Sequence, residues 1–460
     1  MKTNTPRKAG TMNARELALD VLTRVEQEQA YSNLLLNRSL ERSGLSRQDA
    51  ALATEIVYGT IQRLNTLDYF LDRFVKGGVG KLEPWVRNLL RLSLYQIRYL
   101  DRIPDHAAVS EAVRLAKRRG HQGVAGLVNG VLRSMVRRRD ELIIPGGLPP
   151  ETRIALEHSH PEWLVKRWIG QFGEEVTEKI CASDNLPPKI SVRVNRLRRS
   201  RSSLIEEMRA EGLQARESEL SPAGIVLEQA GNMAHTPWFR RGEISIQDES
   251  SMLVAEVTDP RPGMNVLDCC AAPGGKTAHM AEKMDDRGVI WANDVHAHKE
   301  RLVQDQARRL GLGCIRTRTG DAADLPDVFP PESFDRILLD APCSGLGVIR
   351  RKPDLKWVKQ ERQFAEIARN QLHLLSRAAG LLKPGGVLVY STCTLENTEN
   401  EGVVQAFLAQ HPDFEPDPAI ASLVPAPVIR SDRTMEGAVL ILPHQFRSDG
   451  FFICRLKRRE

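Results

Sequence analysis

The sequence lacks any apolar run of the roughly 20 residues that a membrane-spanning helix needs. Its first segment, Met1 to Met12, is polar and basic and has no apolar core of the kind found in secretory signals. These two absences disfavour membrane and secreted proteins. We therefore expect a protein of the cytoplasm that has no membrane partner.

The sequence also lacks the cysteine spacings of disulfide-rich and zinc-binding domains. Its seven cysteines are odd in number and irregularly spaced, and no C-x-x-C pair occurs among them. In a reducing compartment such cysteines stay as thiols. The histidine pairs His158/His160 and His296/His298 have no cysteine beside them, so we expect no structural metal site.

Positive charge is concentrated in the first third of the chain. Residues 1–150 hold 24 Lys and Arg against 15 Asp and Glu, whereas the remaining residues carry a small negative excess. This asymmetry favours attraction to a phosphate backbone, although a solvated helical face is the alternative. Within it, Lys117–Arg119 and Arg137–Arg139 are expected phosphate contacts, or else charges that stabilise helix ends.

The 460 residues are too many for one compact core and predict several domains. Residues 1–143 show apolar residues at three- and four-residue spacing, which predicts an all-α domain. A linker rich in Pro and Gly follows over 144–161. Residues 162–241 mix two strand-like segments, Lys189–Asn195 and Gly224–Leu227, with a helical one, Ser202–Glu211, and predict a small α+β module.

Residues 242–460 alternate short apolar runs with helical stretches. This pattern predicts an α/β domain with a mostly parallel sheet covered by helices. The expected strands are Asn265–Cys269, Val289–Asn293, Cys314–Thr317, Arg336–Asp340 and Val387–Ser391. A closing hairpin is expected from Gly437–Leu442 and Gly450–Leu456.

A loop with two adjacent glycines follows the first of these strands, in the run Asp268-Cys-Cys-Ala-Ala-Pro-Gly-Gly-Lys-Thr277. Ligands of such sheets bind at the carboxyl ends of the strands, and Gly274 and Gly275 allow close approach of the backbone. A triphosphate-binding loop would need glycine where Cys270 stands, which disfavours a triphosphatase. The G-x-G-x-x-G pattern of dinucleotide sites is also missing.

Acidic residues stand at four successive strand ends: Asp268, Asp294, Asp321 and Asp340. One such carboxylate is usually a helix cap, but four at one edge point to a shared ligand that carries hydroxyls, an amine and a positive centre. S-adenosylmethionine has all of these groups. An acidic residue at the second strand, here Asp294, is placed to accept hydrogen bonds from ribose hydroxyls.

Three motifs resemble the RNA cytosine-5 methyltransferase family: the run 268–277, Asp-Ala-Pro-Cys-Ser-Gly at 340–345, and Ser-Thr-Cys-Thr at 391–394. The resemblance implies a Rossmann-like methyltransferase fold with a mostly parallel seven-stranded sheet and an antiparallel last strand. It also implies S-adenosylmethionine as cofactor. The residues that it assigns to the cofactor site are Cys270, Ala271, Ala272, Pro273, Gly274, Gly275, Lys276, Asp294, Asp321 and Asp340.

Two cysteines, Cys343 and Cys393, follow adjacent strands and are expected to face one cleft. The usual alternative for a cysteine is a small buried apolar residue, which we accept for Cys181, Cys314 and Cys454. Methylases of exocyclic amines have an aromatic residue where Cys343 stands, so the thiol favours methylation of carbon. In the family the Ser-Thr-Cys thiol, here Cys393, is the nucleophile, and the Pro-Cys thiol, here Cys343, assists release. Asp340 is expected to hold the cytosine edge, whereas spacing alone would allow the two cysteine roles to be exchanged.

The helical first third resembles the RNA-binding NusB family in Ala14–Leu22, Leu89–Ile97 and Asn129–Arg133. Joined to this catalytic domain, it resembles the layout of methyltransferases of 16S ribosomal RNA. The implied partner is naked or early-assembly 16S RNA, with no obligate protein partner. Alternatives are a transfer RNA substrate or a non-catalytic RNA-binding assembly factor. Arg193 and Asn195 either contact RNA or are structural.

Overall fold

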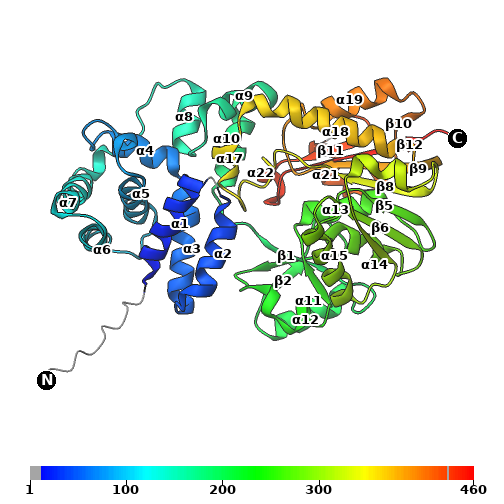
Figure 1. Ribbon diagram of the computed structural model, residues 1–460, viewed down its shortest axis with the longest axis horizontal. Helices are drawn as coiled ribbons and strands as arrows, with labels where there is room; N and C mark the ends of the chain where they lie inside the picture. The colour runs from blue at the N-terminus through cyan, green and yellow to red at the C-terminus, as the bar shows by residue number, and fades with distance from the viewer. Residues whose placement is uncertain (1–11, 29, 433–434) are drawn as a thin grey trace. The chain divides into compact units, whose positions relative to one another are not determined.

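The computed structural model describes residues 12–28, 30–432 and 435–460 (Figure 1). The polar start of the chain, predicted not to be a secretory signal, lies outside these residues up to position 11. The chain divides into two compact units: residues up to 185 together with 352–358, and residues 186–351 together with 359–460. None of the helices in the described part of the chain is long and apolar enough to cross a membrane.

The first unit is helical throughout its described residues, which confirms the predicted all-α domain. Its α-helices are α1 (Ala14–Glu28), α2 (Ser32–Ser43), α3 (Arg47–Gln62), α4 (Leu64–Asp72), α5 (Pro84–Tyr99), α6 (Asp105–Arg119), α7 (Gln122–Arg137), α8 (Pro150–Glu157), α9 (Glu162–Phe172), α10 (Glu174–Asp184) and α17 (Leu355–Val358). Two short 3₁₀ helices, η1 (Val79–Lys81) and η2 (Arg139–Glu141), complete it.

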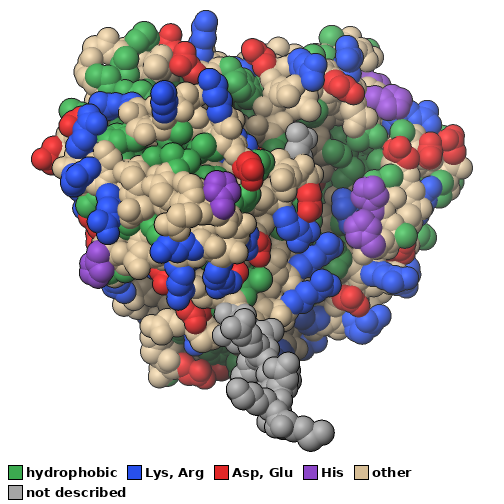
Figure 2. Space-filling view, turned by 60° about the vertical axis from the view of Figure 1, so that its left-hand side comes forward, with side chains coloured by type: hydrophobic (Ala, Val, Ile, Leu, Met, Phe, Trp, Pro, Cys, Tyr) green, Lys and Arg blue, Asp and Glu red, His purple; other side chains and the backbone are tan. Residues whose placement is uncertain are grey.

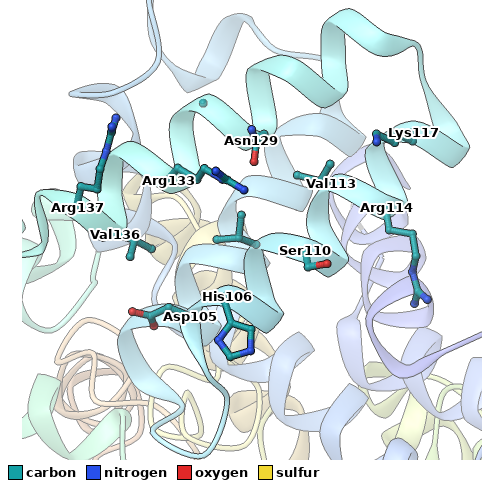
Figure 3. A pocket seen from close by; sticks show the side chains of 12 residues that line it. Asp105, His106, Ser110, Val113, Arg114, Lys117, Asn129, Arg133, Val136 and Arg137 are labelled. Atoms are coloured by element: carbon teal, nitrogen blue, oxygen red, sulfur yellow. The ribbon is translucent and has the colours of Figure 1, made fainter.

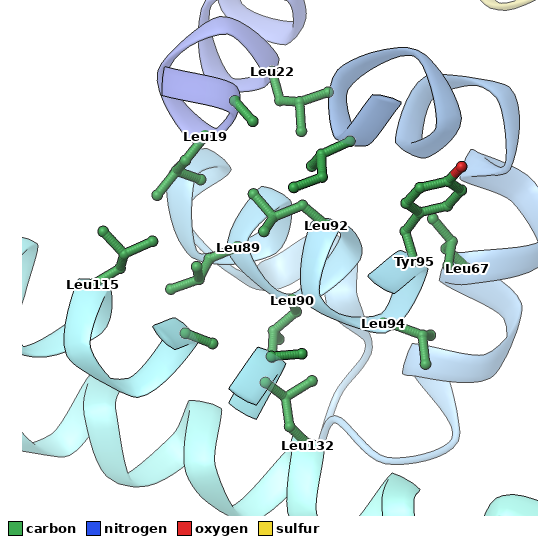
Figure 4. Packing of buried hydrophobic residues seen from close by; sticks show 14 of the residues in the cluster. Leu19, Leu22, Leu67, Leu89, Leu90, Leu92, Leu94, Tyr95, Leu115 and Leu132 are labelled. Atoms are coloured by element: carbon green, nitrogen blue, oxygen red, sulfur yellow. The ribbon is translucent and has the colours of Figure 1, made fainter. Parts of the chain in front are cut away.

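Helix α5 forms the centre of the helical core (Figure 4). Pro84 occupies its first turn, where the fixed φ of proline favours a helix start and no amide hydrogen is needed. The helix is buried on most sides, and two of its buried polar residues bond to the backbone of the helix itself: Ser93 Oγ donates to the Leu89 carbonyl at 2.7 Å, and Gln96 Nε2 donates to the Leu92 carbonyl at 2.9 Å. Ser93 and Gln96 can therefore be buried with their side chains hydrogen-bonded.

The segment 352–358 completes the helical unit although it comes late in the chain. Lys356 Nζ donates to the Gln62 carbonyl at 3.0 Å, and Trp357 Nε1 donates to the Ile61 carbonyl at 2.7 Å. These carbonyls belong to the last turn of α3, where carbonyl groups have no hydrogen-bond donor within the helix. Burial lowers the pKa of Lys356 to about 7. The segment thus caps α3 with residues that stand 294 and 296 positions further along the chain.

The second unit begins with a four-stranded antiparallel sheet in the order β2-β3-β1-β4. Strands β1 (Ile190–Val194) and β3 (Gly224–Glu228) and helix α11 (Arg201–Ala210) confirm the predicted segments. Strands β2 (Gln214–Glu217) and β4 (Ile244–Ile246) were not predicted. Because β4 pairs with β1, this small sheet includes chain beyond residue 241.

The larger sheet of the second unit has the order β10-β12-β9-β8-β5-β6-β7, with β11 also paired to β12. The predicted strands appear as β5 (Asn265–Asp268), β6 (Val289–Asp294), β7 (Ile315–Thr319), β8 (Phe334–Asp340) and β9 (Leu382–Thr392). Their pairings are all parallel, and β12 (Phe451–Arg458) runs antiparallel to β9. The Rossmann-like fold is therefore confirmed.

Within the described residues this sheet has eight strands, whereas seven were expected. Strand β11 (Ala438–Ile441) pairs with the first half of β12, and β10 (Phe414–Pro416) pairs with its second half. Two short strands placed end to end therefore occupy one edge position of the sheet. The pairing of β11 with β12 confirms the predicted closing hairpin.

Helices and short 3₁₀ segments connect the strands of the second unit. They are α12 (Pro237–Arg240), α13 (Glu249–Thr258), α14 (Gly275–Lys283), α15 (Ala297–Leu310), α16 (Leu325–Val328), α18 (Phe364–Ala379), α19 (Glu401–Gln410), α20 (Ile420–Leu423), α21 (Ala426–Asp432), α22 (Pro443–Phe446), η3 (Met233–His235), η4 (Ala322–Asp324) and η5 (Glu361–Gln363).

Truncation of a leucine in α5 tests the helical core. Leu90 is fully buried there, so Leu90→Ala should lower the free energy of unfolding by about 2–5 kcal/mol, through lost burial and the cavity left behind. Urea unfolding followed by tryptophan fluorescence measures this, since Trp85 packs against the same core. Leu34→Ala, at a side chain that is 52% exposed, is the control and should change stability by less than about 0.5 kcal/mol.

Candidate active site at the carboxyl edge of the parallel sheet

The loop between β5 and α14 wraps closely around the end of the sheet. Gly274 has φ of +99°, and a Cβ at this position would lie 3.1 Å from the Cα of Val303. The amide of Ala271 donates to the Asn293 carbonyl at 2.8 Å, and the amide of Ala272 donates to Asp294 Oδ2 at 3.3 Å. The predicted loop 270–276 is therefore held against the end of β6, beside Asp294.

The four predicted carboxylates lie at or just after the carboxyl ends of β5, β6, β7 and β8. Asp294 is almost buried and accepts hydrogen bonds from the amides of Ala272 and His296. Asp321 is exposed and accepts from the amide of Ala323 at 2.9 Å, so it also caps η4. The structure thus places the four predicted carboxylates at one edge of the sheet. Asp321 also caps a helix, which was the alternative considered for a single carboxylate at a strand end.

Asp268 is the most deeply buried of these carboxylates. Its Oδ2 accepts a hydrogen bond from Thr277 Oγ1 at 2.7 Å, and its Oδ1 is buried without a hydrogen-bond partner. Burial raises the pKa of Asp268 to about 7. An unpartnered buried acceptor beside a glycine loop suits a ligand that brings a hydrogen-bond donor, such as an amine.

The two predicted thiols meet at the ends of neighbouring strands. Sγ of Cys343, after β8, lies 3.4 Å from Sγ of Cys393, after β9. Both side chains are partly exposed. The hydrogen bond with Cys393, together with burial, raises the pKa of Cys343 well above the ordinary value for a thiol. Cys343 is therefore held as a neutral thiol against its neighbour.

Lys276 links the glycine loop to the thiol pair. Its Nζ donates to Asp340 Oδ2 at 2.6 Å and lies 5.0 Å from the centre of the Phe451 ring. Burial alone would lower the pKa of Lys276, but the Asp340 carboxylate outweighs it and raises the pKa. The resulting cation is close enough to Cys393 to favour a thiolate there.

A buried glutamate that sequence reasoning missed supports the loop of Cys343. Glu399 is fully buried, and its Oε2 accepts from the amide of Ser344 at 2.9 Å and from Gln371 Nε2 at 3.1 Å. Gln371 also donates to the Pro342 carbonyl at 2.9 Å. Burial raises the pKa of Glu399. Nothing in the local sequence around Glu399 indicates this role, because its partners lie 28 and 55 residues away.

Backbone contacts hold the two cysteine loops together. The amide of Gly347 donates to the Cys393 carbonyl at 2.9 Å, and the amide of Gly450 donates to the Gly347 carbonyl at 2.8 Å. A Cβ on Gly347 would lie only 2.1 Å from the Gly450 carbonyl oxygen. Only glycine allows this approach, so the loop spacing depends on the absence of a side chain.

Arg193 and Asn195 have structural roles. Arg193 is fully buried, forms an ion pair with Glu282 at 2.8 Å and donates to the Gly275 carbonyl at 2.8 Å. Asn195 is buried and donates to the carbonyls of Gly242 and Leu310. Of the two alternatives for these residues, the structural one is correct. Arg193 braces the first turn of α14, directly behind the glycine loop.

Models of three known families match three successive parts of the chain. A family model described as 16S rRNA methyltransferase RsmB/F matches residues 255–457, and the NusB family matches residues 12–137. A ferredoxin-like domain of RsmF/B-like methyltransferases matches residues 160–234. These matches confirm both resemblances inferred from the motifs.

Similar proteins align over nearly the whole chain. A probable ribosomal RNA small subunit methyltransferase B of Bacillus subtilis is 48% identical over 97% of this chain and 99% of its own length. The ribosomal RNA small subunit methyltransferase B of Klebsiella pneumoniae strain MGH 78578 is 34% identical over 97% and 99%.

Solved structures of similar fold include the following two. The crystal structure of PH0851 has a TM-score of 0.80 at 28% identity and covers both chains fully. The structure of NSun6 from Pyrococcus horikoshii with SFG, an analogue of S-adenosylmethionine, has a TM-score of 0.59 at 25% identity over 65% of this chain and 98% of that one. The chain belongs to the RsmB/F family of S-adenosylmethionine-dependent ribosomal RNA methyltransferases.

Proposed function

We propose that this protein methylates carbon 5 of a cytosine in 16S ribosomal RNA through a covalent bond between Cys393 and carbon 6 of the base. The observation that carries the proposal is the pair of thiols, Cys343 and Cys393, with sulfur atoms 3.4 Å apart at the ends of adjacent strands. Methylation of an amine needs no thiol, whereas carbon 5 of cytosine reacts only after a nucleophile has added to carbon 6. The relatives named for the small ribosomal subunit support 16S RNA as the substrate.

We assign the cofactor site to the loop 270–276 with Asp294, Asp321 and Asp340, and we add Asp268. When bound, S-adenosylmethionine supplies an electrophilic methyl group. Asp294, at the end of β6, is placed to accept hydrogen bonds from ribose hydroxyls. The unpartnered Oδ1 of Asp268 would accept from the cofactor amine.

In the proposed chemistry Cys393 attacks first. Lys276 stabilises its thiolate, the thiolate sulfur bonds to carbon 6, and the electron pair of the ring double bond becomes available at carbon 5 for transfer of the methyl group. Asp340, held by Lys276 and by Ser391 Oγ at 2.9 Å, positions the cytosine edge. The base must be unstacked for a thiol to reach carbon 6, which favours naked or early-assembly RNA in the cytoplasm.

Release reverses the first step. A base takes the proton from carbon 5, the ring double bond re-forms, and the bond between sulfur and carbon 6 breaks with its electron pair on Cys393. Cys343 keeps its proton because its pKa is raised, and it lies within hydrogen-bond distance of the departing sulfur. Cys343 is therefore the group assigned to assist release.

Substitution of the two thiols separates their roles. Cys393→Ala should abolish methylation, because no covalent bond to carbon 6 can form. Cys343→Ala should instead accumulate a covalent protein–RNA adduct, because departure of Cys393 is slowed. Denaturing gels with radiolabelled 16S RNA measure both outcomes. Cys314→Ala, at a buried thiol just before the amino end of β7, is the control. An adduct formed by the Cys393 variant would reverse the assignment.

The substrate is tested by bisulfite sequencing of total RNA from cells with and without the protein. We expect loss of one 5-methylcytosine in 16S RNA and no change in transfer RNA. A mark lost from transfer RNA, with 16S RNA intact, would refute the substrate. Rescue by the wild-type gene but not by the Cys393→Ala variant shows that the mark depends on catalysis and excludes a purely structural assembly factor.

The raised pKa of Asp268 predicts how cofactor and pH combine to set stability. Without cofactor the folded protein holds a proton on Asp268 up to about pH 7, whereas the unfolded chain loses it near pH 4. Stability from this group therefore falls as pH rises from about 4 to 7, by at most about 1.4 kcal/mol per pH unit. A cofactor ammonium compensates the carboxylate, so the rise in melting temperature caused by saturating S-adenosylmethionine should grow from pH 5 to 7.

Asp268→Asn should remove most of this pH dependence, as measured by thermal melts with and without cofactor. Asp327→Asn, at a side chain that is 73% exposed, should leave it unchanged. A cofactor shift in the Asp268 variant that grows with pH as in the wild type would contradict the assigned contact.

A further inference from the structure

A groove lies between α6 and α7 of the helical unit, with a volume of about 910 Å³ (Figure 3). Its apolar lining is made by Val109, Val113 and Val136, which are buried or half-buried. Polar and charged side chains come from both helices. Figure 3 shows Arg133 extending from α7 toward α6. The groove is therefore apolar inside and positively charged along its sides.

Three of its cations form no ion pair or hydrogen bond within the described residues: Lys117, Arg133 and Arg137. All three are exposed. The single acidic residue of the lining, Asp105, is paired with Arg139 at 3.4 Å. The groove thus presents uncompensated positive charge, as a site for a polyanion would.

The other predicted phosphate contacts are engaged elsewhere. Arg118 pairs with Glu16, Arg119 with Asp20, and Arg138 with Glu141. Within the clusters 117–119 and 137–139, only Lys117 and Arg137 are unpaired in the described part of the chain, and both line the groove. The face shown in Figure 2 carries Lys and Arg side chains over much of its surface, so abundance of cations does not by itself mark the groove. What marks it is that the unpaired members of the two clusters line one groove.

The spacing of the groove residues on α7 suits a single strand. Asn129, Arg133 and Arg137 recur every four residues, so they form one row with steps of roughly 6 Å along the helix. This step is similar to the distance between successive phosphates of an extended strand. The axes of two packed helices lie roughly 8–10 Å apart, so the surface groove along them is narrow. A single strand can lie along it, whereas a duplex could contact only its rim.

We propose that the α6–α7 groove binds a single-stranded segment of the RNA substrate, separate from the cytosine that is methylated. Lys117, Arg133 and Arg137 contact its phosphates, and the valine lining receives the faces of its sugars and bases. Among the described residues that line the groove there is no Phe, Tyr or Trp, and the ring of His106 is the only one that could stack on a base, so binding depends on charge and shape more than on base identity. The proposal rests on RNA being the substrate, but it does not depend on which carbon or nitrogen is methylated.

Charge removal in the full-length protein is the first test. Lys117→Gln, Arg133→Gln and Arg137→Gln together should weaken binding of protein-free 16S RNA at least tenfold. The slope of log affinity against log salt should become less steep by about 2, the value for three phosphate contacts of a single strand. The single-turnover methylation rate at saturating RNA should stay unchanged, because the methylating site is not altered.

The matched control removes three cations of the same unit that do not line the groove: Arg38, Arg42 and Arg47 are exposed and, among the described residues, also unpaired. If this triple weakens binding as much as the first, net charge rather than the groove is responsible, and the proposal is wrong.

A steric test uses two glycines of α7. Gly130 lines the groove and Gly126 does not, and a Cβ at either position meets no atom within 4 Å. Gly130→Trp should fill the groove and weaken binding of a single-stranded RNA dodecamer about tenfold, whereas Gly126→Trp should not. Circular dichroism is used to check that both variants stay folded. Equal affinity of the two variants would overturn the proposal.

Competition experiments identify the occupant. The single-stranded dodecamer should displace 16S RNA from the wild type, while its duplex and a polyglutamate peptide should compete at least tenfold less well. If polyglutamate competes more strongly than the dodecamer, the occupant of the groove is an acidic protein segment and the proposal is wrong. Failure of the proposed carbon-5 chemistry would appear separately, as wild-type protein that binds RNA in the groove but forms no 5-methylcytosine.

Discussion

The arrangement of the two cysteine loops depends on the approach of two backbone segments at Gly347 and Gly450. Their hydrogen bond joins the loop after β8 to the start of β12, and the amide of Gly347 also holds the Cys393 carbonyl. Three segments distant in sequence are thereby fixed at one edge of the sheet. The distance of 3.4 Å between the two sulfurs follows from this arrangement. A single methyl group on Gly347 would separate these segments.

Burial sets the charge states around the thiols. Asp340 keeps Lys276 charged, although burial opposes that charge, while Asp268 and Glu399 lie where burial favours their protonated forms. The Lys276 cation acts on Cys393, while the pKa of Cys343 is raised by its hydrogen bond with Cys393 and by burial, in agreement with the thiolate proposed for Cys393. This supports, on physical grounds, role assignments that spacing alone left open.

The sequence predicted the parts of the site that follow from parallel-sheet geometry. Strand ends converge, so Asp294, Asp340, Cys343 and Cys393 could be placed at one edge from their positions after strands. Contacts between distant segments were not predictable: Glu399 meets Ser344, and Arg118 meets Glu16, with no local pattern to indicate either pair. Strand β2 was missed because its sequence is mostly polar and only Ala215 is buried, and β4 was missed because it is only three residues long. Strand β4 is defined by its pairing with β1, not by its own sequence.

The segment 352–358 has a consequence for the order of folding during synthesis. It supplies Lys356 and Trp357 to the end of α3, but it is translated well after the other helices of that unit have left the ribosome. Until then, two carbonyls of α3 lack these hydrogen bonds. The amino-terminal unit therefore reaches its final structure only after most of the parallel sheet has been synthesised. Maturation of the first unit is thereby tied to synthesis of the second, which disfavours release of a finished helical unit without its catalytic partner.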